Sequence, residues 1–348
     1  MIGKRRAKGT AGGNGDVRII LFKPGPIGDL LHSLPVAYAL KKKYPHAKIT
    51  VISGFGLADI LEGNPYIDER VYIPSHIFRK DLTGLVRHIR EVRSLEADLF
   101  VDLKSNTRSF LIRALSGAKT RLHYKKQRMV REGQRRLHAI ENLLETIFPV
   151  VGTQDPEDFT AYLTREDAGV ADSFVDSLGL EQDRPLIALN PNVSIPDSSR
   201  HWPPGSFAML GDRVKKELNG EVFLIGGPED REYCEDVAAR METRPVVTAG
   251  NLTLGQTGAF LKKCATLVSG DTGPMHLAAA VGTRVIALFG SMDPDRAGPY
   301  GRGHSVLIKD LPCVPCEEKT CPLETTQCMK DISVDEVFEE VRKILESS

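Results

Sequence analysis

A turn of small and acidic residues follows an apolar run late in the chain and is typical of a ligand site. Thr266 to Ser269 end the apolar run, and Asp271-Thr272-Gly273 form the turn. Pro274 stands where a helix accepts proline, because the first N–H groups of a helix have no partners inside it. A helix that begins at Gly273 would present those N–H groups and its positive dipole end to a ligand. Diphosphates bind at such helix starts.

The segments after this turn predict a helix and strand buried in a parallel sheet. Met275 to Val281 is almost entirely small or apolar, and Val285 to Phe289 is a short continuous apolar run. This pattern alone also fits an ordinary strand-helix-strand unit without a ligand. The loop from Ser291 to Arg296, which is rich in Asp and Pro, favours the ligand site.

A second candidate is Asp29, which ends a glycine-containing loop after the first apolar run of the chain. The loop from Gly25 to Gly28 lacks the third glycine of a dinucleotide fingerprint, which argues against an oxidoreductase. Asp29 could be the N-cap of the following helix, or a carboxylate in a cleft that serves as a general base. Spacing alone favours the cap.

Polar residues also follow strands in the second half of the chain. Ser194 and Arg200 lie in loops after a predicted strand, and hydroxyl and guanidinium groups suit phosphate oxygens. The alternative is a polar loop whose single tryptophan, Trp202, packs on the sheet. Glu229 follows a Gly-Gly-Pro turn, where it could accept hydrogen bonds from a ribose or favour a helix start.

Four of the six cysteines lie in one late segment, separated by two, four and six residues: Cys313, Cys316, Cys321 and Cys328. Four thiolates at such spacing could hold a structural zinc ion or an iron-sulfur cluster. The last spacing is wider than usual for zinc. We expect a structural staple, made by a metal or by disulfides under oxidation, or else surplus thiols. A redox catalyst is disfavoured.

Composition sets limits on the class of protein. The 348 residues suffice for two domains, and the net charge of zero argues against a nucleic-acid partner. No stretch is long and apolar enough to span a bilayer, and residues 1–16 lack the apolar core of a signal peptide, so we expect a cytoplasmic protein with a flexible tail. The run from Lys119 to Arg136 has eight basic residues and one acidic residue. It is either a solvated surface or a landing site for a phosphorylated or membrane-attached acceptor.

Alternating apolar runs and helical patterns predict two doubly wound α/β domains. We expect the first over 17–165, with strands at 17–23, 49–52, 69–73 and 99–103 and helices at 30–43, 57–62, 82–94 and 107–115. The second is expected over 166–332, with strands at 186–189, 221–225, 246–247, 266–268 and 285–289, before a terminal helix in 333–348. Two such domains place a ligand cleft between the carboxyl ends of their sheets.

The order and spacing of several short motifs resemble the lipopolysaccharide heptosyltransferases of glycosyltransferase family 9, over nearly the whole chain. The motifs that carry the resemblance are Gly28-Asp29 with Leu34-Pro35 and Tyr44-Pro45, Arg200-His201-Trp202-Pro203, Gly226-Gly227-Pro228-Glu229, and Asp271 to Ala279 with Gly290 to Tyr300. The resemblance implies a GT-B fold with two Rossmann-like domains, the first binding the acceptor and the second the nucleotide sugar.

The resemblance also implies an activity. Heptose would pass with inversion from ADP-L-glycero-D-manno-heptose to a lipopolysaccharide inner-core acceptor of the lipid A/Kdo type, at the cytoplasmic face of the inner membrane. Asp29 would be the general base, and Thr272 and Gly273 would hold the diphosphate. The remaining donor-binding residues implied are Ser194 and Arg200 for phosphate, Glu229 for the nucleoside, Asp271 for sugar hydroxyls, and His276.

The resemblance requires no metal beside the phosphates, although Mg²⁺ could assist. The chain departs from the family pattern at one position: Arg200 stands where family members often carry lysine. Arginine keeps the charge but changes its geometry, so the reaction type is better specified than the donor. Two rivals stay open: a GT-B transferase for another nucleotide sugar, and a nucleotide-sugar-binding protein without turnover.

Overall fold

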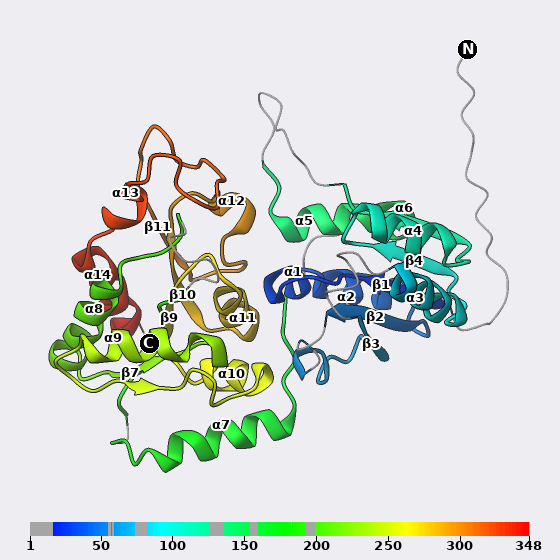
Figure 1. Cartoon of the computed structure of the whole chain (residues 1–348). Helices are drawn as coiled ribbons and strands as arrows, with labels where there is room; N and C mark the ends of the chain where they lie inside the picture. Colours follow the sequence, from blue (N-terminus) through cyan, green and yellow to red (C-terminus); the bar gives the residue numbers. More distant parts are fainter. Residues whose placement is uncertain are drawn as a thin grey trace.

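The computed structural model describes residues 17–54, 57, 59–73, 82–125, 136–153, 159–181, 183–192 and 199–347. Within these ranges the chain forms two α/β domains, each built on a parallel sheet (Figure 1). The predicted fold class, two Rossmann-like domains that face a cleft, is therefore confirmed.

The N-terminal sheet has the strand order β3-β2-β1-β4-β5, and every pair is parallel. Its strands are β1 (Arg18–Phe22), β2 (Lys48–Gly54), β3 (Glu69–Ile73), β4 (Leu99–Asp102) and β5 (Thr120–His123). The three inner strands are apolar on both faces, as expected for a sheet covered by helices on both sides.

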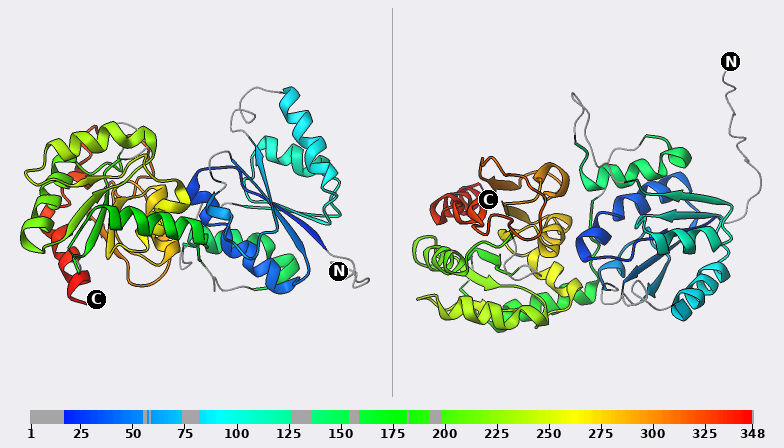
Figure 2. Two further views of the ribbon diagram at one scale, coloured as in Figure 1. Left: turned by 90° about the horizontal axis from the view of Figure 1, so that it is seen from below. Right: turned by 45° about the horizontal axis from the view of Figure 1, so that its top comes forward.

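Two groups of helices cover this sheet. One face carries α3 (Leu82–Ser94) and α4 (Thr107–Leu115), which bury Leu85, Val92 and Ile112. The other helices of this half are α1 (Ile27–Leu31), α2 (Leu34–Lys43), η1 (Asp59–Leu61), α5 (Ala139–Leu144), η3 (Glu145–Ile147) and α6 (Phe148–Val151). Figure 2 shows α3 and α4 on the opposite side of the sheet from α2 and α5.

The C-terminal sheet has the order β11-β10-β9-β6-β7-β8, also with parallel pairs. Its strands are β6 (Leu186–Asn190), β7 (Glu221–Leu224), β8 (Val246–Val247), β9 (Thr266–Gly270), β10 (Arg284–Phe289) and β11 (Ser305–Ile308). In both sheets the strand order reverses beside the first strand of the domain. Doubly wound sheets bind ligands outside this switch point.

The helices of the second half complete the layers around this sheet. They are α7 (Arg165–Ser177), α8 (Pro204–Glu217), η4 (Pro228–Asp230), α9 (Arg231–Ala239), α10 (Leu254–Leu261), α11 (Gly273–Val281), α12 (Pro294–Ala297), α13 (Gln327–Lys330) and α14 (Val334–Glu346). The predicted apolar face of the terminal helix is buried against α8 through Val337 and Val341.

Three elements differ from the sequence prediction. The helix expected over 30–43 is two helices, α1 and α2, with a break at His32 and Ser33. The start of the basic run, expected as a loop or helix face, is the edge strand β5. A further edge strand, β11, follows the loop after β10 and was not predicted. In the described ranges, no helix is both long enough and apolar enough to cross a membrane.

Candidate functional site

A pocket of about 720 Å³ lies between the two domains. Ile27, Leu57 and Asp59 reach it from the N-terminal domain, and the rest of its lining comes from residues that follow β6, β7, β8 and β9, including the starts of α10 and α11. The pocket therefore lies at the carboxyl edge of the C-terminal sheet and is large enough for a nucleotide-sized ligand. In Figure 1 this is where α1 meets α11.

A hydrogen-bonded group of three polar side chains shapes the start of α11. Asn190 ends β6 and is the register partner of Ser269 on β9. The Asn190 amide donates to the Ser269 hydroxyl at 3.0 Å and to the Thr272 hydroxyl at 2.8 Å. The turn that holds Thr272 is thus fixed by the neighbouring strand.

The first turn of α11 is open toward the pocket. Thr272 is the N-cap residue, yet its hydroxyl does not cap the helix, because it bonds to Asn190. Thr272, Gly273 and Pro274 all line the pocket. The nine-residue helix therefore presents its positive end to any anion bound there.

The far end of the pocket is formed by the Gly-Gly-Pro turn after β7. The Asp230 carboxylate accepts from the Gly227 N–H at 2.8 Å and from the Asn192 amide, which fixes this turn. Glu229 is exposed and lines the pocket together with Leu252. This end offers one carboxylate and an apolar wall, groups that suit a nucleoside.

Asp29 lies in α1, the helix of the N-terminal domain that packs against α11. The N-cap residue of α1 is Pro26, and Asp29 is inside the first turn, so the prediction that Asp29 caps the helix is wrong. Its side chain is 44% exposed and faces two lysines. A carboxylate that is partly open to the cleft and not engaged in capping is available for proton transfer.

The buried Lys23 side chain holds the Asp29 carboxylate in position. The Lys23 side chain is only 6% exposed; its Nζ donates to the Leu103 carbonyl at 3.0 Å and lies 3.6 Å from Asp29 Oδ1. Lys104 Nζ is 4.0 Å from Asp29 Oδ2. Burial lowers the pKa of the Lys23 ammonium, and the Asp29 carboxylate opposes that shift. Sequence reasoning missed both lysines, although each directly follows a strand at the switch point.

Arg200 and Asp271 form a buried ion pair beside the start of α11. The Arg200 guanidinium donates to Asp271 Oδ2 at 3.0 Å and to the Asp271 backbone carbonyl at 3.2 Å. His276 Nε2 lies 3.8 Å from the other oxygen of this carboxylate. The structure thus joins three residues that the sequence analysis assigned to donor binding, but none of the three lines the pocket.

The domain contact next to this ion pair contains two buried histidines. His32 Nε2 and His276 Nδ1 lie 3.1 Å apart and share a hydrogen bond. Burial lowers the pKa of His276, and it lowers the pKa of His32 well below its usual value. Both rings are therefore neutral at neutral pH, and they join the domains without introducing a buried charge. Nothing in the local sequence marks His32, because its partner is remote.

Two glycines allow the domains to approach at this contact. An ideal Cβ added to Gly28 would lie 2.6 Å from His276 Cδ2, and one added to Gly273 would lie 2.0 Å from Ile27 Cγ2. Real Cβ atoms do not reach such distances, so any side chain at either position would separate α1 from α11.

Ser194, the remaining predicted donor residue, lies outside the described residues. The neighbouring Ser199 is held by the cysteine segment: its N–H donates to the Lys319 carbonyl at 3.1 Å, and its hydroxyl donates to the Glu318 carbonyl at 2.5 Å. The segment therefore supports the loop that carries Arg200.

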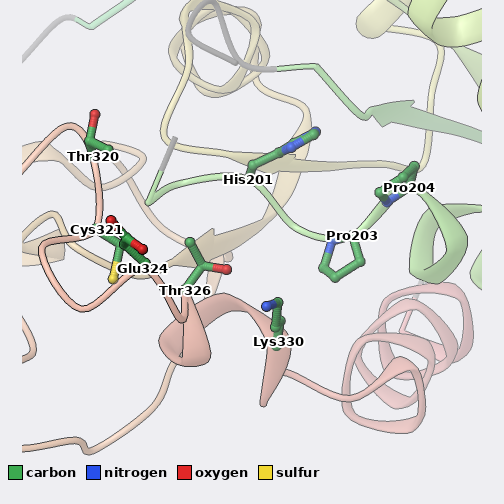
Figure 3. Close-up of a pocket in the computed structure, with 8 residues that line it drawn as sticks. All are labelled: His201, Pro203, Pro204, Thr320, Cys321, Glu324, Thr326 and Lys330. Carbon is green, nitrogen blue, oxygen red and sulfur yellow. The ribbon is translucent and has the colours of Figure 1, made fainter. Parts of the chain in front are cut away.

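A pocket of about 570 Å³ separates this loop from the cysteine segment (Figure 3). His201, Pro203 and Pro204 line one side, and Cys321 and Glu324 are among the residues of the other. All four cysteines of the segment are free, from exposed Cys313 to buried Cys328. In the part of the chain that the structure describes, no group of three His, Cys, Asp or Glu side chains is arranged to hold a metal ion.

The chain is similar to known heptosyltransferases along almost its whole length. Residues 85–327 match the family model described as glycosyltransferase family 9 (heptosyltransferase). A lipooligosaccharide heptosyltransferase 2 of Campylobacter jejuni is 24% identical over 344 residues, which are 95% of this chain and 99% of that protein. Lipopolysaccharide heptosyltransferase 1 of Pseudomonas aeruginosa is 25% identical over 332 residues, or 89% of each chain.

Solved structures agree on the fold. A family 9 glycosyltransferase from Veillonella parvula is 24% identical, with a TM-score of 0.83 and coverage of 97% of this chain and 99% of that one. The Escherichia coli ADP-heptose lipopolysaccharide heptosyltransferase II is 20% identical, with a TM-score of 0.75 and coverage of 95% and 99%. These similarities identify the fold as GT-B. Because the family match spans well over half of the chain, this glycosyltransferase belongs to glycosyltransferase family 9, the heptosyltransferase family.

Proposed function

We propose that the protein transfers heptose, with inversion, from ADP-L-glycero-D-manno-heptose to a lipopolysaccharide inner-core acceptor of the lipid A/Kdo type. The observation that carries the proposal is that the open start of α11 lines a nucleotide-sized pocket, while Asp29 stands on α1, the helix that packs against α11. The names of the relatives from Campylobacter jejuni and Pseudomonas aeruginosa support the class of donor and acceptor. We place the reaction at the cytoplasmic face of the inner membrane, where such an acceptor is lipid-anchored.

In the proposed reaction Asp29 removes the proton from the acceptor hydroxyl as that oxygen attacks the anomeric carbon. The bond between this carbon and the diphosphate breaks, and ADP leaves on the opposite face of the sugar. The N–H groups at Gly273 and the dipole of α11 stabilise the negative charge that develops on the diphosphate. Lys23 orients the Asp29 carboxylate.

Other residues of the site have supporting roles in this proposal. Glu229 contacts the nucleoside, and Ser194 contacts phosphate. Arg200 is held by Asp271, so its guanidinium stands beside the diphosphate while Asp271 faces the sugar. His276 acts through the domain contact with His32. No metal is needed if these donors suffice, and Mg²⁺ is a possible aid to the leaving group.

A two-step experiment tests the activity. A panel of nucleotide sugars is first screened by thermal shift, where a donor at one hundred times its Kd is expected to stabilise the fold by about 2.7 kcal/mol. The best donor is then incubated with a lipid A/Kdo acceptor, and the product is analysed by mass spectrometry. We expect ADP-heptose to give the largest shift and a product heavier by one heptose. A larger shift and product with another nucleotide sugar would identify a different donor, and binding without turnover would identify a non-catalytic protein.

For the cysteine segment we propose a structural role, as a staple that holds the loop of Arg200. A solved structure with 13% identity and a TM-score of 0.57 is that of an iron-containing dodecameric glycosyltransferase of Escherichia coli, TibC. Metal analysis of protein purified without chelator tests whether a zinc ion or an iron-sulfur cluster completes the staple. About one equivalent would support a metal staple, and less than about 0.2 equivalents of zinc and iron together would reject a metal.

A further inference from the structure

The outer surface of α3 and α4 exposes five large apolar side chains. Leu82 and Val86 come from α3, and Phe110, Leu111 and Leu115 come from α4. Leu82 is 72% exposed and Phe110 is 53% exposed. These residues, together with the arginines described below, are called the α3–α4 face.

Exposed apolar side chains are scattered over the rest of the described chain. They are Phe148 on α6, Met209 on α8, Val306 and Ile308 on the edge strand β11, and Leu323 in the cysteine segment. Single exposed apolar residues are normal, whereas a cluster on two neighbouring helices indicates a binding surface.

Helical spacing and one contact place the α3 residues beside α4. Leu82, Val86 and Arg93 occupy positions i, i+4 and i+11, which lie on one side of a helix. The Cγ atom of Arg93 is 3.7 Å from where a Cβ of Gly117 would stand, just beyond the end of α4. This side of α3 therefore faces α4, and the two helices are in contact.

The α3–α4 face is also basic. Arg87, Arg90 and Arg93 are exposed on α3, and none of these three guanidiniums forms an ion pair with the residues that the structure describes. The one acidic residue of α3, Glu91, is paired with His88. On α4 the Arg113 guanidinium stacks over the Phe110 ring at 5.4 Å.

One end of the α3–α4 face, with Leu82 and Phe110, lies at the same edge of the sheet as the loop before Asp29. In a parallel sheet each helix begins where the preceding strand ends, so the first turns of α3 and α4 stand at the carboxyl edge of the sheet. Leu82 opens α3, and Phe110 is in the first turn of α4. Figures 1 and 2 place both helices on the N-terminal domain, away from the C-terminal domain.

We propose that the α3–α4 face docks on the surface of an anionic phospholipid bilayer. Apolar side chains at a helix surface enter the headgroup region, and flanking arginines keep their guanidiniums at the phosphates. A protein partner would more often supply carboxylates for Arg87, Arg90 and Arg93, but exposed apolar side chains on both helices beside these arginines match an anionic lipid surface best. This proposal rests on the proposed function, because contact with the bilayer would hold Asp29 within reach of a lipid-anchored acceptor.

Vesicle binding tests the proposal without any donor or acceptor, so a wrong donor assignment cannot affect the result. The full chain is co-sedimented with vesicles of phosphatidylcholine and with vesicles that contain phosphatidylglycerol. We expect binding to the anionic vesicles only, weakening with salt. The triple variant Arg87→Gln, Arg90→Gln, Arg93→Gln is expected to lower the partition constant on the order of a hundredfold, because each basic residue near an anionic surface contributes several-fold.

Substitutions of the exposed apolar residues test whether their insertion into the bilayer contributes to vesicle binding in addition to the charge of the arginines. We expect Leu82→Ser with Phe110→Ser to reduce binding by roughly tenfold or more, with little change in melting temperature because the two side chains are 72% and 53% exposed. The matched controls are Met209→Ser and Arg244→Gln, an exposed methionine and an exposed arginine of the C-terminal domain, and both should bind as the wild type does.

Three outcomes would overturn the proposal. They are a wild-type chain that does not bind anionic vesicles, α3–α4 variants that bind as well as the wild type, and a wild-type dimer in sedimentation that these variants convert to monomer. The last would make the face an interface between copies. Where the transfer reaction is established, the same variants should keep their rate on a water-soluble truncated acceptor and lose it on an acceptor embedded in vesicles.

Discussion

Replacement of Asp29 by alanine is expected to abolish sugar transfer while donor affinity stays within a few fold of the wild type. The carboxylate is the general base of the proposed reaction, and positioned bases contribute on the order of 10²–10⁴ in rate. The donor pocket is built by other residues, and Asp29 is not among them. Rates are measured by release of ADP, and donor affinity by calorimetry. Asp29→Asn keeps the shape of the side chain and should be equally inactive.

A companion variant tests the role of Lys23 in the same mechanism. Lys23→Met keeps the length of a side chain that is 6% exposed but removes the ammonium 3.6 Å from the carboxylate. We therefore expect kcat to fall while donor affinity stays within a few fold of the wild type, because the carboxylate loses the charge that holds it in position. Full activity of Asp29→Ala would remove this residue from the mechanism, and a wild-type kcat in Lys23→Met would remove the lysine.

Adding a single methyl group at Gly273 is expected to cost on the order of a hundredfold in kcat/KM. The new Cβ would stand 2.0 Å from Ile27 Cγ2, so α1 and α11 must move apart. Displacement of reacting groups by about 1 Å costs roughly this much, because the base and the donor no longer meet in register. Steady-state kinetics of Gly273→Ala measures the loss.

The double variant Gly273→Ala, Ile27→Ala tests the steric cause of that loss. Truncation of Ile27 removes the methyl group that the new side chain would meet, so we expect most of the activity to return. Gly205→Ala is the matched control, since a Cβ at Gly205 has no atom within 4 Å, and its kinetics should be those of the wild type. Wild-type kinetics in Gly273→Ala alone, or no recovery in the double variant, would contradict the close approach.

Local sequence patterns predicted the elements that are buried on one or both faces. The bounds predicted for β3, α3, α4 and β8 agree with the structure to the residue. In α3 the apolar residues Leu85 and Val92 recur at helical spacing, and the helix buries them against the sheet. Such periodicity reports burial directly, and this is why it identifies the two doubly wound domains.

An edge strand with exposed side chains and a break between two consecutive helices were not predicted from the sequence. The edge strand β5 has the sequence Thr-Arg-Leu-His, with mostly exposed side chains, so no apolar alternation marks it. The break between α1 and α2 falls at His32 and Ser33, just before Pro35 in the first turn of α2, but the apolar spacing on both sides was interpreted as one helix. The start of α1 was set at Leu30 instead of Ile27, and spacing alone therefore favoured Asp29 as a cap.

The parts of the site that depend on remote residues could not be predicted. Thr272 and Gly273 were selected because they lie at a strand-to-helix turn with a recognisable pattern, whereas Asp29 was assigned as the base by the family resemblance. The pairing of Arg200 with Asp271, and that of His32 with His276, joins residues 71 and 244 positions apart. Only the fold brings such partners together, and no local spacing encodes them.

The glycine contacts of α1 and α11 make substitutions at the domain contact differ in their effect from substitutions at the other end of the pocket. Near Gly28 and Gly273 the domains meet at atomic clearance, so substitutions there need compensation in the other domain. At the other end of the pocket, Pro228 and Leu252 come from the C-terminal domain, and the N-terminal domain contributes Asp59, whose carboxylate accepts from the Leu254 N–H at 3.2 Å. Substitutions of Pro228 or Leu252 leave the contact between α1 and α11 in place, so the proposed donor preference can change there without moving the two helices apart.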